Sequence, residues 1–101
     1  MSDETLHRLI AAGWEFWHPR NEAKEVIAIC AIRRWVPAGE DMLMFYAEAD
    51  AVGVRVNPAG EAVWHRTGTV VEVATEMLGL PHPDSPTAPR LVIASPVLWT
   101  P

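Results

Sequence analysis

The pattern of apolar and polar residues along the 101-residue chain is clearest over residues 69–79. Apolar side chains recur there three and four positions apart, which places them on one face of a helix. Thr69 and Glu72 have the spacing of a capping box, in which each side chain accepts a hydrogen bond from a backbone N–H at the helix start. The pattern predicts a helix over 69–79 that ends at Gly79 in a left-handed cap, with Leu80 folding back onto it.

Alternation with a period of two, which is typical of strands, fills most of the chain before that helix. A short helix is predicted first, over residues 3–12, because apolar residues at helical spacing follow an acidic first turn. The predicted strands cover residues 14–18, 25–36, 42–48, 52–56 and 61–67, with a last strand at 91–94.

The faces of two of these strands carry further information. Residues 25–36 form the longest predicted strand and begin apolar on both faces, so we expect a central strand that is covered on both sides. In the strand 52–56, valines alternate with Gly53 and Arg55, so we expect one of its faces to lie in water.

These elements predict a single α+β domain over residues 1–101. We expect two layers: a curved, mainly antiparallel sheet of five to six strands, with the helix 69–79 on one face. Four prolines make residues 81–89 an extended crossover, and residues 90–101 form a terminal strand and tail. Two helices of about ten residues cannot cover both faces of such a sheet. The tail, curling of the sheet or a second subunit must therefore cover the other face.

Composition excludes several classes of function. The net charge is −5 and no basic block extends beyond Arg33-Arg34, which argues against nucleic-acid binding. No apolar run approaches the ~20 residues that span a membrane. The acidic start of the chain does not resemble a signal peptide, so we expect a cytoplasmic location. The preference for Arg, Ala and Val is typical of GC-rich bacterial genomes.

The sequence contains no motif for catalysis, for a cofactor or for a metal. The four histidines do not have the spacing of metal ligands. Cys30 lies in an apolar run, where a buried, inert thiol is expected, and neither Ser85 nor Ser95 lies in a nucleophile motif. We therefore predict no catalytic, cofactor-binding or metal-binding residues, and we favour a non-enzymatic protein.

Five tryptophans are many for a chain of this length, and Trp and Arg are common at binding hot spots. Trp14 and Trp64 are expected in the core. The candidate interaction surface consists of the remaining three tryptophans and one arginine: Trp17, Arg33, Trp35 and Trp99.

These tryptophans and arginines could also have purely structural roles. The tryptophans could instead fill the core of a small sheet protein, and the arginines could pair with acids on neighbouring strands, such as Glu48 or Asp50. The sequence thus predicts a small cytoplasmic protein-interaction module (an adaptor, regulator or immunity-type protein) that forms a homo-oligomer, in the simplest case a dimer. The alternative is a small-ligand-binding or minor enzymatic domain, with a cleft between the sheet and the C-terminal tail.

Overall fold

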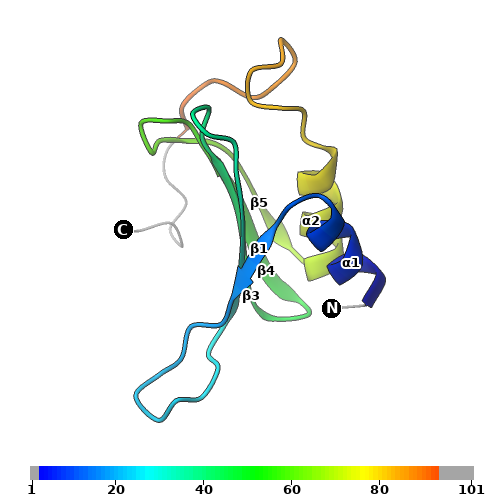
Figure 1. Cartoon of the computed structure of the whole chain (residues 1–101), viewed down its shortest axis with the longest axis vertical. Helices are drawn as coiled ribbons and strands as arrows, with labels where there is room; N and C mark the ends of the chain where they lie inside the picture. Colours follow the sequence, from blue (N-terminus) through cyan, green and yellow to red (C-terminus); the bar gives the residue numbers. More distant parts are fainter. Residues whose placement is uncertain (1–2, 94–101) are drawn as a thin grey trace.

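The computed structural model describes residues 3–93 and shows an α+β fold, as the sequence predicts (Figure 1). Five strands form one antiparallel sheet in which each strand pairs with its neighbour along the chain. The strands are β1 (Glu15–Trp17), β2 (Ile29–Arg34), β3 (Glu40–Ala47), β4 (Asp50–Val56) and β5 (Ala62–Gly68). The helices α1 (Asp3–Ala11) and α2 (Val70–Gly79) lie side by side on one face of the sheet. We call this the helix face and the opposite side the open face.

The start of α2 confirms the predicted capping box, whereas its end differs from the prediction. The Glu72 backbone N–H donates to Thr69 Oγ1 at 3.2 Å, and the Thr69 N–H donates to Glu72 Oε1 at 3.1 Å. Gly79 is the last helical residue and Leu80 is the C-cap, with an extended backbone. The Leu80 N–H donates to the Met77 carbonyl, so the helix closes without the left-handed glycine that the sequence predicted.

The predicted strand 25–36 is shorter than expected, although it lies inside the sheet and its centre is buried on both faces, as predicted. Strand β2 begins only at Ile29 and lies second in the sheet, beside the edge strand β1. A tight reversal precedes it, because Asn21 accepts backbone hydrogen bonds from Lys24 through its carbonyl and from Glu25 through its side chain. Lys24 adopts a left-handed conformation with φ of 64°. The reversal pairs Val26 with Arg20 in an isolated bridge, so residues 26–28 belong to the connection between β1 and β2 rather than to β2.

Strand β4 is buried on both faces, so the predicted wet face of residues 52–56 is wrong. All residues from Ala51 to Val56 are buried. Gly53 lies directly beneath α2, where an added Cβ would come within 2.5 Å of Met77 Sδ and 2.7 Å of Val73 Cγ1. The glycine thus allows the helix to approach the sheet closely, and Arg55 is buried with it.

The chain after α2 runs along one end of the sheet without forming helix or strand up to Ile93. The predicted last strand is therefore absent over residues 91–93, and Ala94 lies outside the described residues. One backbone hydrogen bond takes its place, from the Ile93 N–H to the Ala62 carbonyl at 2.9 Å. Neither α1 nor α2, the helices within residues 3–93, has the length and apolar character needed to cross a membrane.

Candidate functional site

A buried charge cluster connects three neighbouring strands on the helix face. Arg33 on β2, Asp41 on β3 and Arg55 on β4 are paired in register across the sheet. Asp41 is fully buried, and its Oδ1 accepts a hydrogen bond from Arg55 Nε at 2.6 Å. Asp41 Oδ2 accepts from Arg55 Nη2 at 3.0 Å, from Arg33 Nη2 at 3.2 Å and from Trp35 Nε1 at 2.9 Å.

Aromatic rings surround the cationic side of this cluster. The Arg33 guanidinium lies 4.2 Å from the ring centre of Trp35 and 5.3 Å from that of Trp14. Trp35 in turn contacts His82 edge to face, with ring centres 4.7 Å apart. Arg55 Nη1 donates to the Pro81 carbonyl at 2.6 Å, so the cluster also holds the chain that leaves α2.

This cluster is built for structure rather than for proton transfer. The Asp41 carboxylate accepts hydrogen bonds from four donors, so it has little remaining capacity to act as a base. Within residues 3–93, only Trp14 Nε1 and Arg33 Nε are buried side-chain nitrogen or oxygen atoms without a partner. Both belong to the same stacked group.

The predicted interaction residues do not form one surface. Arg33 and Trp35 are part-buried in the charge cluster, whereas Trp17 lies on the open face beside Cys30. Trp99 lies outside the described residues. Both arginines pair with acids of neighbouring strands, as the alternative reading expected, although the acids are Asp41 for Arg33, and Glu15 and Glu40 for Arg34.

An exposed apolar group lies at the end of the sheet that faces away from the crossover. We call it the apolar end; its members are Trp17, Val26, Ile27 and Tyr46. Trp17 and Tyr46 expose 46% and 53% of their surfaces. The connection between β1 and β2 carries Val26 and Ile27, and Figure 1 shows it projecting from the sheet, away from both helices. Val26, Ile27 and Tyr46 also line one shallow hollow of about 250 Å³.

The centre of the open face is apolar but almost inaccessible. Cys30, Val52 and Val54 expose 2%, 7% and 3% of their surfaces. Burial raises the pKa of the Cys30 thiol, which keeps the thiol protonated and unreactive. A small hollow of about 40 Å³ lies against these residues and Trp17.

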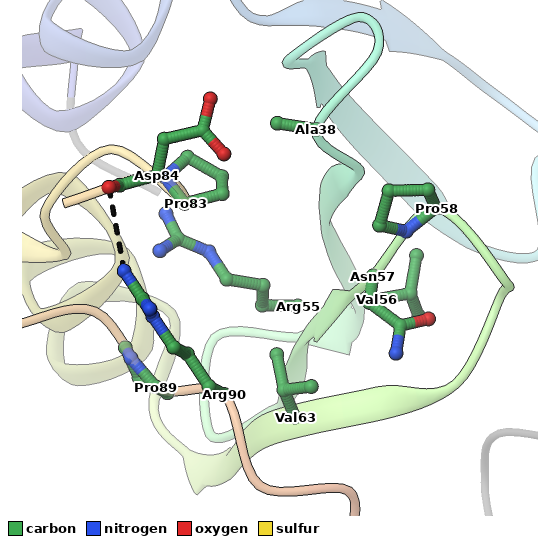
Figure 2. A pocket seen from close by; sticks show the side chains of 10 residues that line it. All are labelled: Ala38, Arg55, Val56, Asn57, Pro58, Val63, Pro83, Asp84, Pro89 and Arg90. Atoms are coloured by element: carbon green, nitrogen blue, oxygen red, sulfur yellow. Dashed lines mark hydrogen bonds between the residues drawn. The ribbon is translucent and has the colours of Figure 1, made fainter. Parts of the chain in front are cut away.

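A pocket of about 290 Å³ lies where two hairpin turns meet the crossover (Figure 2). Its walls combine apolar side chains, among them Val56 and Val63, with the charged groups of Asp84 and Arg90. Arg90 Nη2 donates to the carbonyl oxygens of Asp84 at 3.4 Å and Ser85 at 2.9 Å. The Asp84 carboxylate points away from Arg90 (Figure 2), and nothing within residues 3–93 pairs with it.

The sequence contained only weak signals for these features. Asp41 and Arg55 are charged residues within the apolar strands β3 and β4. They indicate a buried ion pair only when the register shows that the two residues lie opposite each other. Val26 and Ile27 lie in the predicted strand 25–36, for which both faces are expected to be covered, and Tyr46 lies in the predicted strand 42–48, yet all three are exposed. Nothing in their local sequence shows that they are exposed.

No group of three His, Cys, Asp or Glu side chains within residues 3–93 converges on a point that could hold a metal ion. Comparison of the chain with protein families, with curated proteins and with solved structures finds no match.

Proposed function

We propose that the chain is a small, non-enzymatic protein-interaction module that binds a second copy of itself through the apolar end. The observation that carries this proposal is the grouping of Trp17, Val26, Ile27 and Tyr46, all large and exposed, at one end of the sheet. Aromatic side chains with one exposed face are the residues most often found at binding hot spots.

The charges around the apolar end favour a second copy as the partner. The connection of residues 18–28 carries Arg20 and Lys24 together with Glu22 and Glu25, so its formal charges sum to zero. The whole chain carries −5, so repulsion between two copies is smallest where this connection lies at the contact. A two-fold interface brings the same patch of both copies together, and a patch that carries both signs of charge is able to complement itself.

A cytoplasmic location is part of this proposal. A free, buried thiol such as Cys30 is usual in proteins of reducing compartments. An adaptor, a regulator and an immunity-type protein each act by binding another protein specifically. Binding through the apolar end would be enough for any of these roles.

The test is the molar mass in solution, measured by light scattering over a dilution series. We expect a dimer that dissociates on dilution. The substitutions Trp17→Ala and Tyr46→Ala should each weaken association by about 2 kcal/mol, or roughly 30-fold in Kd. The matched control is Ile10→Ala, which removes an equally exposed apolar side chain from α1 on the helix face.

Two results of these measurements would contradict the proposal. A monomer at every concentration would sink the self-association proposal. Equal weakening by Ile10→Ala and Trp17→Ala would place the interface elsewhere or indicate a general loss of solubility. Circular dichroism of each variant checks that the fold is retained.

A second candidate function is the binding of a small ligand in the pocket of Figure 2. The Asp84 carboxylate has no partner within residues 3–93, whereas the two arginines that line the pocket, Arg55 and Arg90, already donate to other oxygens. Together with the apolar walls on the other side of the pocket, this carboxylate favours a small apolar molecule with a cationic amine. Such a ligand would raise the melting temperature by mass action. The shift should disappear in Asp84→Asn, and a panel of small apolar amines that shifts neither protein would remove this candidate.

A further inference from the structure

The open face carries an apolar cluster that neither helix covers. Both helices lie on the other face, yet Cys30, Val52 and Val54 at the centre of the open face are as inaccessible as core residues. In the strand register, Met44 lies between Cys30 and Val52, and Met42 pairs with Val54. Both methionines pack against this cluster and are only partly buried, so they leave an apolar surface on which a further group can pack.

The chain itself arrives at this face at its last described residue. Ile93 packs against the cluster of Val52, Val54, Val56 and Ala62. Its backbone N–H also donates to the Ala62 carbonyl at 2.9 Å, at the start of the edge strand β5. The following segment, residues 94–101, thus starts beside the open face.

The segment 94–101 has the length and the composition to cover that face. Its eight residues reach about 26 Å when extended, at ~3.3 Å per residue. The distance from β5 to β2 is three strand spacings, or about 14 Å. The segment contains Val97, Leu98 and Trp99 and no charged side chain, which matches the uncharged centre of the open face.

We propose that residues 94–101 dock on the open face of their own chain, over Cys30, Val52 and Val54. A segment that reaches Cys30 ends beside Trp17, because these two residues pair directly between β2 and β1. The docked segment therefore competes with a partner for Trp17. This regulatory consequence rests on the proposed function, whereas the docking does not.

Cys30 reports on the docking without any added label. The test compares the full chain with a variant truncated after Ile93 and measures the rate at which an aromatic disulfide reagent labels Cys30. We expect the truncation to accelerate labelling about tenfold or more, because the thiol changes from a closed to a locally open environment. Labelling is performed at a concentration at which light scattering shows monomer, so that a second copy cannot provide the protection.

Three controls distinguish docking from a general loss of stability. Urea unfolding gives the stability of each variant and hence the fraction of globally unfolded molecules. The labelling rate expected from that fraction is subtracted from the observed rate. Leu91→Ala removes an exposed side chain outside the cluster and should leave the rate unchanged. Ile93→Ala removes the side chain that packs against the cluster but keeps the backbone hydrogen bond to Ala62, so it should accelerate labelling by less than the truncation does.

An unchanged labelling rate in the truncated protein would overturn the docking. Faster labelling together with tighter self-association would support both the docking and the competition for Trp17. Faster labelling with unchanged self-association would support the docking and overturn the competition. A chain that remains monomeric with and without the segment would refute the proposed function and leave the labelling result to decide the docking.

Discussion

Removal of the Asp41 carboxylate should be among the most destabilising single substitutions in this protein. Asp41→Ala leaves Arg55 almost fully buried and Arg33 largely buried, both without their anion. Breaking a buried ion pair by removing one partner typically costs about 3–5 kcal/mol. A domain of this size has a free energy of unfolding of about 5–15 kcal/mol, so the variant should lose a large part of it.

Two further substitutions turn this estimate into a rank order. Arg55→Met removes one cation but leaves Asp41 with Arg33 and Trp35 as donors, so the loss should be smaller than for Asp41→Ala. Arg34→Ala removes an exposed arginine whose ion pairs with Glu15 and Glu40 are 3.6 and 3.7 Å long. Exposed pairs of this kind contribute about 0–1 kcal/mol.

Urea unfolding followed by circular dichroism measures all three variants. The slope of the transition should stay the same if each variant remains two-state. The reasoning would be refuted if Asp41→Ala were no more destabilising than Arg34→Ala. It would also be refuted if Arg55→Met were the more damaging change, because the carboxylate would then not be the centre of the cluster.

Three further predictions concern α2. Gly53→Ala should lower the free energy of unfolding by about 1–3 kcal/mol, because the new methyl group meets Val73 and Met77. Gly79→Ala has open space around the new methyl group and should raise the free energy of unfolding by about 0.5–1 kcal/mol. Thermal unfolding measures both variants. Thr69→Ala should cost about 1 kcal/mol through loss of the helix cap, measured in the same way. The hydrogen bond from the Thr69 backbone N–H lowers the pKa of Glu72. The ionised Glu72 side chain therefore stabilises the fold at any pH above the ordinary glutamate pKa, and this stabilisation is lost as the pH falls through the lowered pKa of Glu72 in the folded protein. The stability difference between the wild type and Glu72→Gln should therefore be present at neutral pH and vanish in acid, in urea titrations at each pH.

The sequence predicted the elements whose causes are local. The capping box of Thr69 and Glu72 and the stripe of α2 involve residues within one or two helical turns, so spacing alone reveals them. The turn at residues 57–60 is likewise local: the Asn57 side chain accepts hydrogen bonds from the Ala59 and Glu61 backbone N–H groups. Short turns between strands then give the antiparallel order observed.

The errors concern which face of a strand is buried, because burial depends on partners that are distant in sequence. Arg55 looked like a solvent-facing residue, and only its register with Asp41 and Arg33 shows why a charge lies there. Val26 and Ile27 looked like core because they are apolar, but the reversal at Asn21 holds them outside the sheet. The predicted interaction residues are separated for the same reason: Trp17 is exposed, whereas Arg33 and Trp35 belong to the buried charge cluster.

The hydrogen bond from Arg55 to the Pro81 carbonyl has a consequence for local opening of the native state. Residues 81–82 cannot detach from the sheet without exposing a buried guanidinium and separating His82 from Trp35. We therefore expect the start of the crossover to open only together with the β-sheet. Residues 84–92 have no comparable attachment to the sheet among the described residues, and we expect them to open separately. Limited proteolysis of the native protein should therefore begin within residues 84–92 and spare residues 80–82, which divides the crossover into a part that belongs to the core and a part that does not.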